Sequence, residues 1–237
     1  MSGLVTISGD ELSLALLLPA RGMPEIVAFG PDAAGAAPPG ARASRINGMD
    51  VAVPSAVLLP TGGMGFFGWP AISGHRDGRD FTISFEHWTA DTTGAGTVLR
   101  AVDPVARLSL AIRLAIAEGT LATSVSLRND GTSAYALDRC MAGSMVIGPG
   151  ELTLTSFGGM WGREFHENHE RPGRGLWLQE SRRGRTSHDR SPSLLLAAGG
   201  DTLALHLGWS GNHLIAVDLL DDGAPDLAMA LAMARMF

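Results

Sequence analysis

The run Arg107-Leu-Ser-Leu-Ala-Ile-Arg-Leu-Ala-Ile116 decides the fold class, because a large apolar residue occurs at every second position. Successive side chains of a β-strand point to opposite faces, so this period places leucine and isoleucine on one face and small or polar residues on the other. After Glu118-Gly119 the same alternation resumes over residues 121–127. The two runs therefore predict a long antiparallel hairpin that turns at the glycine.

The same alternation extends through most of the chain. It recurs over residues 81–85 and 203–209, and further candidate strands lie at 4–8, 11–18, 25–29, 97–102, 135–147, 151–156, 193–198 and 213–220. The 31 glycines and 13 prolines separate these short runs, and no amphipathic helix is indicated before residue 224. We therefore expect an all-β sandwich of antiparallel strands in a single domain.

Composition narrows the classes of function. The net charge is −6, and all 18 basic residues are arginines. Their densest cluster, at 163–190, is interleaved with glutamates, which disfavours nucleic acid as a partner because nucleic acid binds an uncompensated basic surface.

The lone cysteine, Cys140, permits neither an intrachain disulfide nor a thiolate metal cluster, and its apolar neighbours predict a core position. The apolar run at 12–18 is too short for a signal or membrane helix, so we expect a cytoplasmic protein without membrane contact.

The densest group of candidate functional side chains lies between residues 158 and 192. Seven of the 18 arginines and three of the seven histidines fall there, together with two tryptophans. Guanidinium groups and indoles favour shared carboxylates and stacked partners at interfaces. This segment therefore predicts an interaction surface with six candidate residues: Trp161, Arg163, Glu164, His166, Arg182 and His188.

Two histidines of this segment raise the question of a metal site. His166 and His169 are three residues apart and would share one face of a helix, but the zinc-protease spacing His-Glu-x-x-His is absent. Pro172 and Gly173 follow closely and disfavour a helix. We expect a polar loop network here, with no metal site and no cofactor.

A long glycine-rich and aromatic loop is predicted over residues 61–80. It carries Trp69, His75 and Arg76. An indole can stack on the apolar face of a sugar ring while imidazole and guanidinium groups bond its hydroxyls, so these residues are candidates for a carbohydrate rim. A surface loop that packs on itself is the alternative, and the residues alone favour it. Spacing identifies no pair of carboxylates as acid and nucleophile, so no catalytic residue is assigned.

Three motifs in the second half of the chain carry a family resemblance. They are Met160-Trp-Gly-Arg-Glu-Phe-His166, then Gln179-Glu-Ser-Arg-Arg-Gly-Arg-Thr-Ser-His188 followed by Ser191-Pro192, then Gly208-Trp-Ser-Gly-Asn212. In this order and spacing they resemble the N-terminal domain of glycoside hydrolase family 36 α-galactosidases. Gly22-Met-Pro-Glu-Ile26 and Gly74-His-Arg76 resemble earlier parts of that domain, so the resemblance covers most of residues 21–218.

The resemblance implies a galactose mutarotase-like β-supersandwich, which we expect over residues 1–223. In the family this domain precedes a (β/α)₈ barrel, which carries both catalytic aspartates of a retaining mechanism, and a C-terminal β domain. We expect this chain to lack the barrel and to be inactive alone. Its expected roles are packing on a catalytic barrel, oligomerisation and a contribution to the rim of an α-galactoside site. Residues 224–237 are apolar and depart from the family, which predicts a last strand or a short helix that is truncated.

Two alternatives keep the fold and change the function. In the first, the chain is a stand-alone carbohydrate-binding sandwich whose loop around Trp69 binds an α-galactoside. In the second, which is less favoured, it is an aldose epimerase-like enzyme with a histidine acid and a late glutamate base. The last glutamate is Glu180, and only aspartates follow it. That order weighs against an epimerase.

Overall fold

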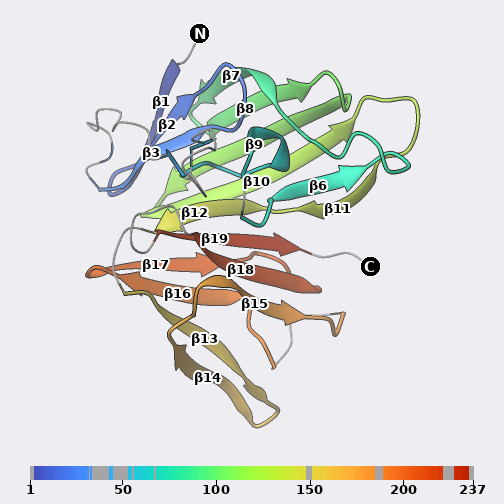
Figure 1. The fold of residues 1–237 in the computed structure, drawn as a ribbon. Coiled ribbons are helices and arrows are strands. Elements are labelled where there is room, and N and C mark those ends of the chain that lie inside the picture. The colour runs from blue at the N-terminus through green and yellow to red at the C-terminus, as the bar shows by residue number, and fades with distance from the viewer. Residues whose placement is uncertain are drawn as a thin grey trace. The chain divides into compact units, whose positions relative to one another are not determined.

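The computed structural model describes residues 3–31, 33, 43–44, 53–54, 56–66, 68–147, 151–184, 189–220 and 227–234. Strands dominate these residues (Figure 1), and η2 (Gly62–Met64) is a single 3-10 turn. Each strand pair whose register is defined is antiparallel. Within the described ranges no helix is long and apolar enough to cross a bilayer. The expected all-β, antiparallel architecture is confirmed.

Contacts divide the chain into two compact units that meet in sequence between Gly143 and Ser144. The first unit holds two larger sheets and two strand pairs. Its strands are β1 (Gly3–Ser8), β2 (Ser13–Leu18) and β3 (Glu25–Gly30) in one sheet; β7 (Glu86–Thr93), β8 (Gly96–Asp103), β9 (Leu108–Ala117) and β10 (Thr120–Asn129) in the other; and the pairs β4 (Ala43–Ser44) with β5 (Val53–Pro54) and β6 (Ile72–His75) with β11 (Ala136–Cys140).

The hairpin predicted first is the pair β9–β10. Its ladder runs without a break from Thr120 opposite Ala117 to Asn129 opposite Leu108. The turn residues Glu118 and Gly119 have φ of 49° and 66°. A two-residue turn of type I′ requires positive φ at both positions, and glycine adopts it without strain. The four leucine and isoleucine side chains from Leu108 to Leu114 are at most 1% exposed, so the predicted inward face is the buried one.

The second unit contains two four-stranded sheets. One has the order β12-β19-β18-β15, with β12 (Gly143–Ile147), β15 (Gly175–Ser181), β18 (His213–Leu220) and β19 (Leu227–Ala234). The other has the order β14-β13-β16-β17, with β13 (Thr153–Met160), β14 (Arg163–Glu170), β16 (Ser193–Ala198) and β17 (Asp201–His206). Leu154, Leu196 and Val217 are fully buried in this unit.

Several expected elements differ in the structure. Residues 81–85 form no strand, because their backbone groups bond to loops: the Ile83 carbonyl accepts the Gly63 N–H at 3.1 Å and the Phe85 carbonyl accepts the Gly22 N–H at 2.8 Å. The strand expected at 203–209 ends at His206, and the one expected at 135–147 is interrupted between β11 and β12. Of the two elements expected near the end, a last strand or a short helix, residues 227–234 form the strand, which pairs with β18. The single domain and its boundary at residue 223 stay predictions.

Candidate functional site

Residues 61–80, the aromatic loop, contain more regular structure than a loop, because β6 lies within them and pairs with β11. Asp77 and Gly78 form a tight turn at its end, with φ of 48° and 75°. Arg76 and Arg79 close that turn by exchanging two backbone hydrogen bonds, each of 2.8 Å. An Asp-Gly pair flanked in this way is a strong sequence signal for such a turn.

Arg76 anchors this turn from inside the first unit. Its side chain is 8% exposed and lies 3.3 Å from Asp80 Oδ2. The same guanidinium donates to the Ala106 carbonyl and to Asn129 Oδ1, and it lies 5.1 Å from the centroid of the Tyr135 ring. Burial raises the pKa of Tyr135 to about 12, so its hydroxyl stays protonated and donates to the Asp80 carbonyl at 3.2 Å.

Trp69 and His75 are more accessible than Arg76, since both side chains are half-buried. The Arg139 guanidinium lies 3.7 Å from the centre of the Trp69 ring and donates to the Pro70 carbonyl at 2.9 Å. His75 Nδ1 accepts the Gly78 N–H at 3.2 Å. The structure therefore holds the three rim candidates on one segment, and it gives Arg76 three hydrogen-bond acceptors within the protein.

The arginine-rich segment begins with a β-hairpin rather than the expected polar loop, so that prediction is wrong. Residues 163–170 form β14, paired along its length with β13. All eight β14 residues are exposed, which explains why no hydrophobic alternation marks this strand. In a strand, residues three apart point to opposite faces, so His166 and His169 do not share a face. His169 lies 3.0 Å from Thr155 Oγ1 on β13.

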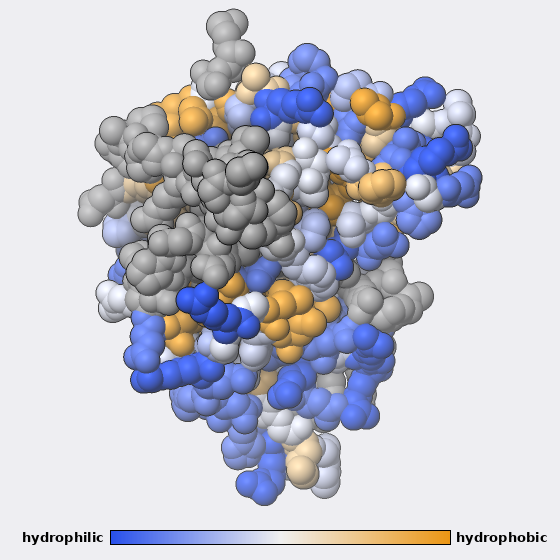
Figure 2. Space-filling model, viewed as in Figure 1, coloured by the Kyte–Doolittle hydropathy of each residue, from blue (hydrophilic) through white to orange (hydrophobic). Residues whose placement is uncertain are grey.

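The tip of this hairpin is apolar and exposed. Trp161 is 87% exposed, and Met160 and Phe165 are each 62% exposed. Glu164 Oε1 accepts the Gly162 N–H at 2.7 Å, which fixes the turn. Phe165 stacks on Phe157 with ring centroids 4.5 Å apart. In Figure 2 the surface over this hairpin is mostly hydrophilic, with an apolar spot near its tip.

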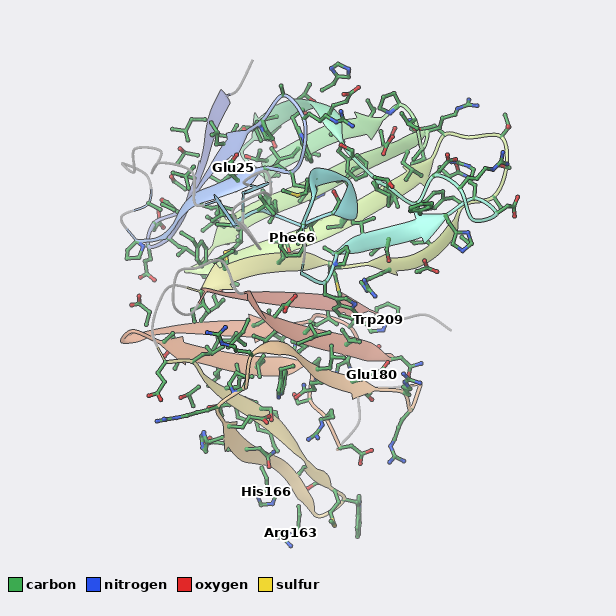
Figure 3. The ribbon with its side chains drawn as sticks, in the orientation of Figure 1. Glu25, Phe66, Arg163, His166, Glu180 and Trp209 are labelled. Carbon is green, nitrogen blue, oxygen red and sulfur yellow. The ribbon has the colours of Figure 1, made fainter. Side chains whose placement is uncertain are left out.

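Four of the six interface candidates, Trp161, Arg163, Glu164 and His166, lie on this hairpin. Figure 3 shows Arg163 and His166 near its far end, directed away from the ribbon. Arg182 follows β15, which belongs to the other sheet, and its Nε lies 2.8 Å from Glu180 Oε2. His188 lies outside the described residues. Within the described ranges, no three His, Cys, Asp or Glu side chains gather as a metal site.

A buried polar cluster that sequence reasoning missed lies on β15 and β18. His213 faces Ser181 across the ladder, and its side chain is completely buried. Burial lowers the pKa of His213. Gln179 donates from Nε2 to the Ser191 carbonyl. The family motifs carried the signal, because Gln179, Ser181 and Ser191 belong to one motif and His213 directly follows another.

The same motifs interlock elsewhere in the second unit. The Gly184 N–H donates to Asn212 Oδ1 at 2.6 Å. A Cβ on Gly211 would lie 2.6 Å from Trp209 Nε1, so alanine there would require the Trp209 ring, which is 39% exposed, to shift. The bond from Gly184 to Asn212 joins the second motif to the third. The motifs therefore specify packing within this unit.

Comparisons with known proteins agree with this architecture. The family model described as "Glycosyl hydrolase family 36 N-terminal domain" matches residues 22–234, so the expectation that the chain departs from the family from residue 224 on is wrong as far as residue 234. An α-galactosidase from Escherichia coli is 31% identical over 175 residues, which are 70% of this chain and 24% of that protein.

Two solved structures share the fold. A GH36 α-galactosidase, AgaA, from Geobacillus stearothermophilus has a TM-score of 0.82 at 16% identity, over 98% of this chain and 37% of that one. The α-galactosidase from Lactobacillus brevis also has a TM-score of 0.82, at 17% identity, over 98% of this chain and 36% of that one. These matches confirm the expected β-supersandwich class. The chain spans well under half the length of these relatives, and it belongs to the glycosyl hydrolase family 36 N-terminal domain family.

Proposed function

We propose that this chain is the noncatalytic N-terminal domain of an α-galactosidase-like glycoside hydrolase. Its roles are to pack on a catalytic barrel, to support an oligomer and to contribute to the rim of the active site. The match over residues 22–234 to a domain of that family carries the proposal. The curated relative is named an α-galactosidase, and this chain corresponds to 24% of its length.

The exposed hairpin supports the interface role. An indole that is 87% exposed contributes large contact area when buried against a partner, and interfaces are enriched in tryptophan and arginine. Trp161 at the tip with Arg163 beside it has that composition. Glu164 and His166 supply polar contacts on the same hairpin, and Arg182, which follows β15, is a further proposed contact residue. His188 lies outside the described residues and stays a candidate from the sequence. A catalytic barrel or a second copy of the parent protein is the proposed partner.

The aromatic loop supports the rim role. Trp69 and His75 are half-buried, and each offers the chemistry that contacts a sugar: an aromatic face and a ring nitrogen. Arg76 serves this rim by fixing the turn at Asp77-Gly78, since its donors bond to Ala106, Asn129 and Asp80. In this proposal the loop contacts an α-galactoside only when a barrel completes the site.

The cytoplasm is the proposed location. The chain has one cysteine, so it holds no intrachain disulfide, as is usual for proteins in a reducing compartment. Burial raises the pKa of Cys140 to about 11, which keeps the thiol protonated and unreactive.

A galactose titration of the purified chain by isothermal calorimetry tests the proposal. Because the rim is incomplete without a barrel, we expect no saturable heat up to tens of millimolar galactose. A Kd of about 1 mM, equivalent to about −4 kcal/mol, would instead establish a stand-alone sugar-binding sandwich. In that case Trp69→Ala should abolish the heat, while Trp209→Ala, in the other unit, should leave it unchanged.

A further inference from the structure

β14 is an edge strand with one side open. It is the terminal strand in the order β14-β13-β16-β17, and no other described strand pairs with it. The edge of a strand presents unpaired N–H and C=O groups, which form a template for another strand. β16 pairs only with Thr153 to Ser156 on the other side of β13, so the outer half of the hairpin extends beyond that strand.

The glutamate and histidine side chains of β14 are arranged symmetrically about one residue, Asn168. Its regular portion is His166-Glu-Asn-His-Glu170, which lies in one-to-one register opposite Gly158 to Leu154. Reading outward from Asn168, each glutamate on one side corresponds to a histidine on the other. The pattern is therefore complementary to its own reverse.

Antiparallel pairing about a two-fold axis reverses the strand in this way. If Asn168 lies on the axis, Glu167 opposes His169 of the second copy, and His166 opposes Glu170 of the second copy. Symmetry repeats both pairs, which gives four His–Glu contacts and one Asn–Asn contact. A neutral imidazole has one N–H to donate. The ring nitrogens of His169 already lie 3.0 Å from Thr155 Oγ1 and 3.2 Å from Glu167 Oε2 of the same copy, so His169 must share or exchange its Glu167 contact when a second copy pairs.

The Glu167 and His169 pair already exists within one copy. His169 Nε2 lies 3.2 Å from Glu167 Oε2, on the strand face opposite to that of His166. Pairing with a second copy would place its His169 opposite Glu167 and its Glu167 opposite His169. The two carboxylates and two imidazoles would then occupy alternate corners of one four-membered group. Opposite-charge pairs directly across a ladder are stabilising, and like charges are destabilising.

Neighbouring registers lack this complementarity. Two residues that lie directly opposite each other must have their side chains on the same face of the sheet, and successive residues of a strand alternate in face. A two-fold axis normal to the sheet does not exchange the faces. The axis must therefore pass between the two copies of one residue, and not between a residue and its neighbour in sequence. An axis at His166 opposes the His166 residues of the two copies, and one at Glu167 opposes their two Glu167 carboxylates. An axis at His169 opposes two histidines. An axis at Phe165 falls where φ is 59°, which is not extended backbone.

We propose that two copies of this chain associate isologously through β14, with Asn168 on the two-fold axis. The inference rests on the proposed assembly role and assigns it a surface. Charges on an edge strand normally discourage pairing with other chains. Here their order excludes the neighbouring registers and admits this one.

Sedimentation equilibrium of the full chain tests the association. We expect the wild type to reach twice the 24.7 kDa chain mass at tens of micromolar. Glu167→His places a histidine opposite His169 of the other copy at both symmetry-related positions. It should weaken association about tenfold. Glu167→His combined with His169→Glu restores the His–Glu pairs between residues 167 and 169 with the two residue types exchanged, and it should restore the dimer. Glu118→His, the same substitution at the β9–β10 turn, is the control and should leave the mass unchanged.

Disulfide cross-linking tests the register. Directly opposed residues bring their Cβ atoms to about 4.5–5.5 Å, close enough for a disulfide to form with small adjustments. In a Cys140→Ala background, Asn168→Cys should give a covalent dimer with oxidised glutathione, and Arg163→Cys should not. A dimer that ignores Glu167→His and does not cross-link at 168 would overturn the β14 interface and leave the assembly role standing. A monomer at every concentration would overturn both.

Discussion

Replacing Gly131 with alanine should displace the Arg76 guanidinium and loosen the turn that ends the aromatic loop. A Cβ at residue 131 would meet Arg76 Nη2 and would lie 2.8 Å from Arg76 Cζ. The backbone of Gly131 has no positive φ that would itself penalise alanine. The cost of the substitution should therefore come from Arg76 alone.

The size of the effect follows from the bonds that Arg76 makes. A hydrogen bond to a charged group contributes about 1.5–3 kcal/mol. Arg76→Met loses those to Ala106 and Asn129, and it loses a pair with Asp80 that is weakened by the 30% exposure of Asp80. We expect Arg76→Met to cost about 3 kcal/mol, or about 6–12 °C for a chain of this size. Gly131→Ala should cost about 1–3 kcal/mol through overpacking.

A double-mutant cycle separates this mechanism from others. Gly131→Ala should cost almost nothing in the Arg76→Met background, because the displaced group is gone, so the coupling should be at least about 1 kcal/mol. Thermal unfolding followed by circular dichroism measures all four proteins. Gly94→Ala is the control, since nothing lies within 4 Å of a Cβ there. An equal cost of Gly131→Ala in both backgrounds would refute the role assigned to Arg76.

Three further predictions use other residues. Burial lowers the pKa of His213, so the unfolded chain binds that proton more strongly and the stability present above about pH 6.5 is lost as the pH falls. The unfolding temperature of the wild type should drop more between pH 7.5 and 5.5 than that of His213→Gln; parallel curves would count against it. With the pKa of Cys140 raised to about 11, iodoacetamide at pH 8 should alkylate the folded chain at least about 100-fold more slowly than the chain in urea, and comparable rates would contradict this. Trp88→Phe removes the 2.7 Å bond from Nε1 to the Gly22 carbonyl and should cost about 1 kcal/mol in urea unfolding, whereas an unchanged midpoint would show that bond to be without net effect.

The sequence predicted the elements whose hydrophobic side chains alternate. The β9–β10 hairpin was predictable because its buried face gives both strands an apolar alternation. Its turn, Glu118-Gly119, contains a glycine, which adopts the positive φ of a tight turn without strain. The run 81–85 alternates equally well, yet it is not a strand. Ile83, Ser84 and Phe85 are all buried there, and Phe81 is 68% exposed, so burial in this run does not follow the alternation of its sequence.

β14 could not be predicted from periodicity, because a strand that buries no side chain has no apolar period. It exists because its backbone pairs with β13, a contact that only the fold specifies. The aromatic loop shows the same limit at the candidate site. Arg76 was identified as a possible sugar ligand from its neighbours in sequence, whereas its partners Ala106 and Asn129 lie 30 and 53 residues away.

The family motifs were informative in a different way. They predicted the family and the fold class correctly from short segments. In the structure Gln179 bonds to the Ser191 carbonyl and Asn212 accepts the Gly184 N–H, so motif residues bond to one another within the second unit. Residues of a motif can therefore identify a family when some of them serve packing within the domain.

Hydrolysis of p-nitrophenyl α-galactoside by the purified, folded chain tests the central claim most directly. The Escherichia coli α-galactosidase serves as the positive control under the same conditions. The proposal predicts no release of p-nitrophenol above the rate of the heat-denatured chain. Turnover that co-purifies with the chain and is inhibited by galactose would contradict a noncatalytic domain and would place a catalytic pair among the carboxylates of this chain.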